Sequence, residues 1–483
     1  MSLRASIQSR SERWTLAVAA FGTLLVLADY SAAVTTVGET SRSLGAGVSG
    51  QTWALSGMSL GLATALLTVG ALADDLGRRR VLVCSAAALA VASALAALAG
   101  DATVFVVARV LQGMAGAGVI AASLAAIGHA FPAGAARTHA TGVWGAALGA
   151  GIAIGPLAGA ALAVALGWRS GYWLQAASAA ALVPAAATVA ESRAETSRPV
   201  DLPGLLALAG GMASTTAGLV EGRSNWTSAA TLALLAGGVV LLGAFAAIEL
   251  RRHLPMVDLR LLGQAPFVAS VSGALFTGLA IISLMSYSAT FYQSALGIGV
   301  IGSAGVLGAW SATSIVAALG ARRLPSGVPS HMRLAIGLAL AGAGELALTG
   351  LSTGSSWARL LPGLVIAGVG SGIANAALGR LAVESVPHER AGMGSGANNT
   401  ARYLGGAAGV ALVVAVVAAV GGAAGTPAQL VHGWNAITLV CAGLCAAGAA
   451  IAAGCRPRAM PAATALAPTA WSYRGSSARC PGP

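Results

Sequence analysis

Residues 70–80 read Gly-Ala-Leu-Ala-Asp-Asp-Leu-Gly-Arg-Arg-Arg and separate two long apolar runs, 50–72 and 81–99. About 20 apolar residues are enough for a helix to cross the hydrocarbon of a bilayer. A glycine turn with carboxylates and arginines can tie two helix ends together, because arginine pairs with a carboxylate through two bonds. An ordinary arginine-rich membrane loop is the alternative. The residues expected to form this connection, as a gate, are Gly70, Asp74, Asp75, Gly77, Arg78 and Arg79.

The apolar character extends over the whole chain. Of its 483 residues, 57% are apolar and 9% are charged, whereas soluble domains carry roughly 25% charged residues. The 66 glycines show no three-residue period, and the five cysteines form neither a disulfide framework nor a metal-ligand spacing. The composition therefore indicates a membrane protein and predicts no metal site.

Fourteen stretches are long and apolar enough to cross a bilayer. Their limits are 14–37, 50–72, 81–99, 103–127, 140–166, 169–190, 203–220, 229–250, 267–291, 298–320, 332–352, 357–383, 398–421 and 433–454. The runs of Ala, Leu, Val and Gly show no ten-residue alternation, which favours helices over a membrane barrel. We expect an all-α polytopic protein.

The arginines indicate how the chain is oriented. All 27 basic residues are arginines, and they separate apolar runs instead of gathering on one soluble face, which argues against nucleic-acid binding. With both termini cytoplasmic, most of them fall in inner segments, as the positive-inside rule requires. The outer loops then hold Arg42, Arg169, Arg223 and Arg359. We expect a multi-pass protein of the cytoplasmic membrane.

Further motifs follow in a recognisable order. Arg109-Val-Leu-Gln-Gly113 has the form R-x-x-x-G, residues 151–159 read Gly-Ile-Ala-Ile-Gly-Pro-Leu-Ala-Gly, and residues 27–31 read Leu-Ala-Asp-Tyr-Ser. Residues 398–402 read Asn-Asn-Thr-Ala-Arg. Together with the loop 70–80, this set resembles the major facilitator superfamily of secondary transporters, in particular its fourteen-helix drug:proton antiporter branch. Residues 32–39 lack the asparagine and the Ala-Leu-Pro usual in that branch.

The resemblance implies a major facilitator fold of two six-helix halves with two extra central helices. The implied divisions are a cytoplasmic N-terminus 1–13, an N-terminal half 14–190, two extra spans with flanking loops 191–266, a C-terminal half 267–455 and a disordered cytoplasmic tail 456–483. A monomer is what the family implies.

Three charged residues inside the spans are candidates for proton coupling and substrate binding. A charge in a span is costly, so Asp29, Arg109 and Glu345 are expected to be functional or paired. An acid beside an arginine can change protonation with a modest change of surroundings, and the resemblance implies that Asp29 binds the proton or a cationic group while Arg109 assists release. A static Asp29–Arg109 pair is the alternative, and for Glu345 both a functional role and simple pairing stay open.

Small residues mark an expected hinge. Gly151, Gly155 and Gly159 recur every four residues and share one helix face, so another backbone can approach closely, while Pro156 permits a bend. We expect a hinge there, where the two halves close against each other; generic helix packing is the alternative. Other candidates for the cavity or a gate are Gln112, Asn398, Asn399 and Arg402.

These features predict a proton-coupled exporter of small amphipathic or cationic drugs or antibiotics, working by alternating access. An uptake carrier of the same fold is the alternative. No catalytic residues are expected, because the six histidines lie in or beside loops. The lack of a Walker A sequence argues against an ATP-driven pump. The expected partners are a small-molecule substrate, protons and the lipid bilayer, with no cofactor besides the proton gradient.

Overall fold

The computed structural model describes residues 2–132, 135–193, 201–222, 226–252, 255, 259–321, 327–386, 391–422 and 425–455. Within these ranges the chain is helical apart from turns and short connections, and it contains no strand. The α-helices are α1 (Ser2–Ser43), α2 (Val48–Leu76), α3 (Arg78–Leu98), α4 (Ala102–Ala130), α5 (Ala135–Leu166), α6 (Arg169–Ala187), α7 (Leu202–Gly222), α8 (Ala229–Arg251), α9 (Ala265–Phe276), α10 (Ser283–Ala295), α11 (Val300–Gly320), α12 (Ser330–Ala347), α13 (Leu361–Glu384), α14 (Ala391–Gly421) and α15 (Pro427–Gly454). The expected all-α fold is confirmed, and the predicted tail lies outside the described residues.

Local sequence explains where several helices begin. The Asp101 side chain accepts hydrogen bonds from the backbone N–H groups of Thr103 and Val104, which caps the first turn of α4. Thr426 and Gln429 form a reciprocal capping box at the beginning of α15. Gly77 has a φ of +112° and joins α2 directly to α3, a conformation that glycine adopts without steric cost. Capped ends therefore set the short turns between long helices.

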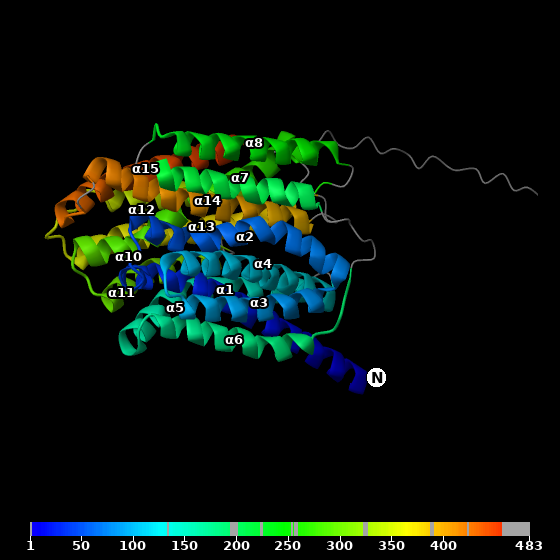
Figure 1. Ribbon diagram of the computed structural model, residues 1–483. Helices are drawn as coiled ribbons and strands as arrows, with labels where there is room; N and C mark the ends of the chain where they lie inside the picture. The colour runs from blue at the N-terminus through cyan, green and yellow to red at the C-terminus, as the bar shows by residue number, and fades with distance from the viewer. Residues whose placement is uncertain are drawn as a thin grey trace, which may run out of the picture.

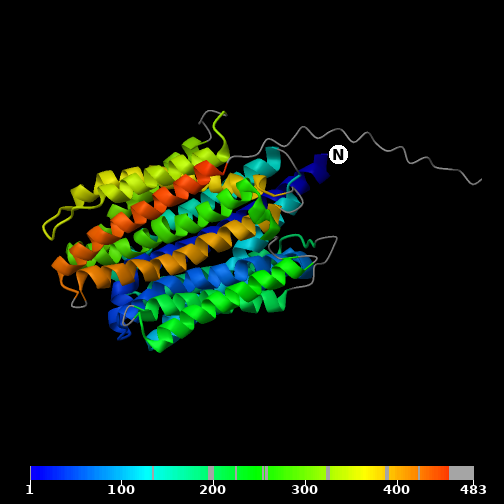
Figure 2. The same cartoon turned by 90° about the horizontal axis from the view of Figure 1, so that it is seen from above.

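The helices lie side by side in one bundle (Figure 1), and Figure 2 shows the same packing from above. Eleven helical segments among the described residues are long and apolar enough to cross a membrane. The long helices α2, α6 and α12 coincide with predicted spans but are not among these eleven. The chain is therefore a multi-pass membrane protein, and the count of fourteen spans stays a prediction.

Arginines mark one end of the bundle, where α1 begins and α2 ends. We call this the arginine-rich end, and the opposite end the far end. Described arginines at or near the arginine-rich end are Arg10, Arg13, Arg78, Arg79, Arg80, Arg137, Arg193, Arg251, Arg252, Arg260, Arg333 and Arg380. Those at the far end are Arg42, Arg169 and Arg359. This asymmetry is the one that the positive-inside rule describes.

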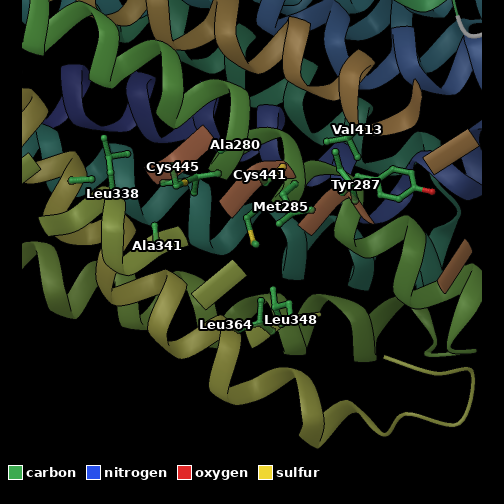
Figure 3. Packing of buried hydrophobic residues seen from close by; sticks show 14 of the residues in the cluster. Ala280, Met285, Tyr287, Leu338, Ala341, Leu348, Leu364, Val413, Cys441 and Cys445 are labelled. Carbon is green, nitrogen blue, oxygen red and sulfur yellow. The ribbon is translucent and has the colours of Figure 1, made fainter. Parts of the chain in front are cut away.

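Two large apolar cores hold the bundle together. One is drawn mainly from α1 to α6 and includes Val26, Leu62 and Leu182. The other is drawn almost wholly from α9 to α15 and includes Leu334 and Trp434; Figure 3 shows part of it. The two cores are drawn mainly from different parts of the chain, although the first also contains residues from α7, α8, α9 and α14. The expected division into halves at 14–190 and 267–455 stays a prediction.

Helices α7 and α8 form a pair at the edge of the bundle (Figure 1). Gly211 and Gly218 of α7 lie against Leu242 and Leu235 of α8, so the two backbones approach closely. Arg252 Nη2 lies 2.8 Å from a carboxylate oxygen of Asp201, which ties the end of α8 to the beginning of α7. Because α7 also contacts α2 and α14, the extra pair touches helices of both cores.

One long helix contains an irregular turn. Between α9 and α10 the chain forms a π-helical turn, η2 (Thr277–Ile282), so that 265–295 is a continuous rod. Gly278 in this turn lies against the backbone of Arg402 in α14, and a side chain there would overlap the Arg402 carbonyl oxygen. Such turns occur inside α-helices, frequently at functional sites. The rod therefore packs on α14 at the depth of a predicted gate residue.

Candidate functional site

Glycines at the crossing of α2 and α4 position the arginine of the R-x-x-x-G motif. A Cβ at Gly113 would overlap the carbonyl oxygen of Met58, and a Cβ at Gly61 would overlap that of Val110. The two helices therefore touch backbone to backbone, one turn from Arg109. This contact places the Arg109 side chain in the interior instead of toward lipid, and it is fully buried.

The predicted pair of Asp29 and Arg109 is present and belongs to a chain of polar groups. Arg109 Nη1 donates to Asp29 Oδ2, 3.3 Å away, and to Gln112 Oε1, 3.0 Å away. Gln112 Nε2 in turn donates to Ser93 Oγ at 2.9 Å. Asp29 is 6% exposed, and the other three side chains are fully buried. The network thus joins α1, α3 and α4 inside the apolar interior.

Arg109 keeps donors that the described protein does not use. Its Nε and Nη2 atoms are buried and have no hydrogen-bond acceptor among the described residues. The guanidinium carbon lies 5.8 Å from the centroid of the Tyr172 ring in α6, close enough for a cation–π contact. Sequence reasoning missed Ser93 and Tyr172, because neither belongs to a motif. The site therefore holds one carboxylate, one arginine with spare donors and an aromatic face.

The glycine face of α5 packs on α1, beside the acid. A side chain at Gly155 would overlap the carbonyl oxygen of Ala28, and a Cβ at Gly151 would lie 2.5 Å from that of Leu24. Thr35 Oγ1 donates to the Pro156 carbonyl oxygen at 3.0 Å. This face was expected where the two halves meet; its glycines pack on α1 of the same half, and α5 as a whole also contacts α11 of the other half. Every-fourth spacing defines a face but not its partner.

The same face continues at Gly159, whose Cβ would lie 2.9 Å from that of Ala32. The close approach of α1 and α5 along all three glycines fixes the depth and rotation of α1, and with it the position of Asp29. The expected role of residues 151–159 as a hinge stays a prediction. We call this close contact between α1 and α5, within the N-terminal half, the seam.

The arginines of the loop at 70–80 bind an acid that the sequence analysis did not single out. Glu191, just after α6, accepts a hydrogen bond from the Arg79 backbone N–H at 3.2 Å and lies 3.5 Å from Arg79 Nε. Arg80 Nε lies 3.9 Å from the same carboxylate. A Cβ at Gly77 would lie 2.6 Å from a Glu191 oxygen, so only glycine leaves room for this contact.

The remaining gate candidates in this loop lie at the end of α2. Gly70 faces Ala121 of α4, at 3.9 Å from the position of a Cβ. Asp75 is half-buried in the last turn of α2, and the Arg78 backbone N–H donates to the Ser192 carbonyl oxygen at 3.0 Å. The side chain of Asp74 lies outside what the structure describes. The segment after α6 therefore braces the junction of α2 and α3.

The candidates at the beginning of α14 separate into different roles. Asn398 is buried and donates to the carbonyl and hydroxyl oxygens of Ser270, at 2.9 and 3.0 Å, which ties α14 to α9. Asn399 donates to the Ser395 carbonyl oxygen of its own helix at 3.1 Å. Arg402 lies about 16 Å from the beginning of α14, at 1.5 Å per residue. Its Nε has no acceptor among the described residues.

Glu345 is not part of the Asp29–Arg109 network. It is fully buried in α12, and Cys445 Sγ of α15 lies 3.4 Å from its Oε2. Cys441 and Cys445 lie near Leu338 and Ala341 of α12 in the apolar core (Figure 3). No ion pair to Glu345 occurs in the described chain, and no group of three His, Cys, Asp or Glu there could hold a metal. The site suits an uncharged acid.

The two halves meet through polar contacts toward the far end. Their donors and acceptors come from α1 and α2 on one side and from α10 and α14 on the other. The hydrogen bonds are Gln293 Nε2 to the Thr35 carbonyl oxygen at 3.0 Å, Gln51 Nε2 to Thr290 Oγ1 at 3.4 Å, and Ser56 Oγ to the Ala407 carbonyl oxygen at 3.4 Å. Tyr30 and Tyr403 meet edge to face nearer the middle of the bundle. The hydrogen bonds between the halves thus lie between the Asp29–Arg109 pair and the far end of the bundle.

A bundle of apolar helices around a buried acid–arginine pair, with two helical cores that meet across polar contacts, defines a secondary transporter rather than an enzyme. The sequence profile of the Major Facilitator Superfamily matches residues 19–410. The chain belongs to this family, which transports small molecules across membranes.

Relatives and a solved structure agree with this assignment. The chain is 29% identical to the multidrug resistance protein Stp of Mycobacterium tuberculosis, over 85% of this chain and 77% of that protein. It is 31% identical to the puromycin resistance protein of Streptomyces alboniger, over 83% and 80% of the two chains. It is 27% identical to the tetracenomycin C resistance and export protein of Streptomyces glaucescens, over 84% and 76%.

The crystal structure of the human organic anion transporter MFSD10 superposes with a TM-score of 0.62 at 18% identity, covering 91% of this chain and 99% of that one. At this identity the likeness concerns the fold alone. It confirms the major facilitator fold.

Proposed function

We propose that this protein exports small amphipathic or cationic drugs, antibiotics among them, in exchange for protons. The observation that carries the proposal is the buried Asp29–Arg109 pair, whose arginine has unused donors and an aromatic neighbour. The resistance and export names of three relatives support the same substrate class. The cargo is then a small molecule that crosses an apolar interior and meets one acid on its way.

Asp29 is the proton site in this proposal. When Asp29 takes up a proton, its attraction for Arg109 falls, and Arg109 is released toward Gln112 and any ligand near its Nε and Nη2 atoms. When the proton leaves, the ion pair forms again. Because an unpaired charge is costly at this depth, Arg109 needs an acceptor both when Asp29 is protonated and when it is charged. Binding of a cationic substrate group to Asp29 and binding of a proton then exclude each other, which is the condition for exchange.

Alternating access couples this exchange to movement. The polar contacts at the far end hold the halves together in the present state. The Glu191 contacts with Arg79 and Arg80 brace the arginine-rich end of the N-terminal half. We infer that the arginine-rich end faces the cytoplasm, that both termini lie there, and that opening of the far end to the exterior completes export. The halves 14–190 and 267–455 are the moving bodies, in a monomer that needs no cofactor besides the proton gradient.

Proton flux in liposomes tests the proposal. Internal pH is recorded while lipophilic cations and antibiotics, puromycin included, are added to purified full-length protein of known orientation. Substrate-triggered proton movement that is lost in Asp29→Asn supports exchange through this acid. Substrate movement unchanged in that variant contradicts it, and substrate moving together with protons would instead identify an uptake carrier.

A further inference from the structure

A hollow of about 640 Å³ lies at the arginine-rich end, outside the Asp29–Arg109 site. It is formed where the beginning of α1 passes the end of α6 (Figure 1). The residues that line it are Arg10, Ser11, Arg13, Trp14 and Thr188. Its volume lies within the range of sites that bind small molecules, roughly 300 to 1,000 Å³. Two positive charges and one aromatic ring therefore share a concave surface that the transport mechanism does not use.

The aromatic wall of this hollow is fixed in place. Trp14 Nε1 donates to Thr188 Oγ1 at 2.7 Å, and Thr188 Oγ1 donates to the Ala185 carbonyl oxygen, also at 2.7 Å. The indole is therefore tied to the last turn of α6 although it is 48% exposed. A half-exposed tryptophan that packs on protein at the beginning of an apolar span is typical of the membrane–water interface.

The charged wall consists of Arg10 and Arg13, three residues apart on one face of α1. Both side chains are exposed, and neither forms an ion pair with any carboxylate in the described ranges. The apolar stretch of α1 that is expected to cross the membrane begins at residue 14, directly after Arg13. Both guanidinium groups thus lie at the depth of lipid headgroups, with donors suited to paired bonds with phosphate oxygens.

We propose that this hollow binds the headgroup of an anionic phospholipid from the leaflet at the arginine-rich end. The phosphate lies between Arg10 and Arg13, and the Trp14 ring packs against the glycerol and the first carbons of the chains. Basic pockets between membrane helices on the cytoplasmic side are suited to such headgroups, because anionic lipids concentrate in that leaflet. The inference concerns lipid binding and does not depend on the direction or the cargo of transport.

Native mass spectrometry of the full-length protein in detergent tests this site. Phosphatidylglycerol, phosphatidylcholine and glycerol 3-phosphate are titrated separately. We expect phosphatidylglycerol to bind most tightly, and Arg13→Gln to weaken it about fivefold, the effect of one basic residue near an anionic headgroup. Arg251→Gln is the matched control, because Arg251 is an exposed arginine at the same end but outside the hollow. Arg13→Lys should lose less than Arg13→Gln, since it keeps the charge.

Three results would overturn the proposal. Equal binding of phosphatidylcholine, whose phosphate charge is balanced by its choline cation, would show that the net negative charge of the headgroup is not recognised. Equally tight binding of glycerol 3-phosphate would identify a site for a soluble anion. Equal losses in Arg13→Gln and Arg251→Gln would show a general effect of surface charge. Because both arginines are exposed, unchanged unfolding temperatures in both variants are expected and confirm that each variant is folded.

Discussion

Replacing Asp29 by asparagine removes the only carboxylate that pairs with Arg109 in the described chain, and the cost follows from the geometry. The Arg109 side chain is 0% exposed and the Asp29 side chain 4%, and Arg109 Nη1 lies 3.3 Å from Asp29 Oδ2. With an effective dielectric constant of about 20, the attraction is about 5 kcal/mol. Breaking a buried pair by removing one partner costs about 3 to 5 kcal/mol. An amide oxygen still accepts a bond from Arg109, so we expect the free energy of unfolding to fall by about 3 kcal/mol.

The companion variant distinguishes a structural pair from a proton site. Asp29→Asn with Arg109→Gln removes both charges, so most of the lost unfolding free energy should return, because no unpaired charge stays buried. Unfolding is followed in detergent by denaturant titration, and transport by substrate-driven pH change in liposomes. We expect the double variant to be stable and unable to exchange protons. An Asp29→Asn variant as stable as the wild type would refute the electrostatic reasoning, and a double variant that still exchanges protons would reduce the pair to a structural contact.

Three further outcomes follow from the packing. Gly155→Leu should abolish transport while the protein still folds, because the new side chain meets the Ala28 backbone. Gly145→Leu on the same helix is the control, since a Cβ there meets nothing within 4 Å. Equal transport by both variants would refute the proposed role of the close contact between α5 and α1. Glu191→Gln should change the unfolding free energy by less than about 1 kcal/mol, as exposed ion pairs do, but slow substrate flux, measured at equal protein density. Glu345→Gln should keep the unfolding temperature and transport, because the site suits an uncharged group; loss of proton exchange in this variant alone would make Glu345 a second coupling site.

The sequence predicted the central pair because its signals are local and strong. A carboxylate and an arginine inside apolar spans must find partners, so a pair of Asp29 and Arg109 was among the alternatives that the sequence left open, and the structure contains it. The R-x-x-x-G spacing gains its physical reason only from the folded bundle, where Gly113 lets α4 touch the backbone of α2. The motif therefore marks a backbone contact between α2 and α4, and this contact positions the Arg109 guanidinium group.

Other features depended on how helices rotate and pack, which spacing alone does not determine. Tyr172 and Ser93 enter the site from α6 and α3 without any motif. Glu191 reaches the loop at 70–80 from a distant part of the sequence. The α5 glycines define a close-packing face in the sequence, but that α1 lies against it, instead of a helix of the other half, is a property of the assembled bundle.

The π-helical turn η2 lets the rod 265–295 hold one residue more than a regular helix would, while α10 keeps its rotation relative to α9. An α-helix advances by about 100° per residue, and a π-turn accommodates one residue more than an α-turn does. Deleting one residue from 277–282 would therefore leave a regular helix of nearly the same length with α10 still in register. Deleting one residue from the regular helix at 283–292 would instead rotate the rest of α10 by about 100°. Gln293 would then point away from the Thr35 carbonyl oxygen with which it joins the halves. In evolution, a one-residue change of length should therefore be more common among related chains within 277–282 than within 283–292.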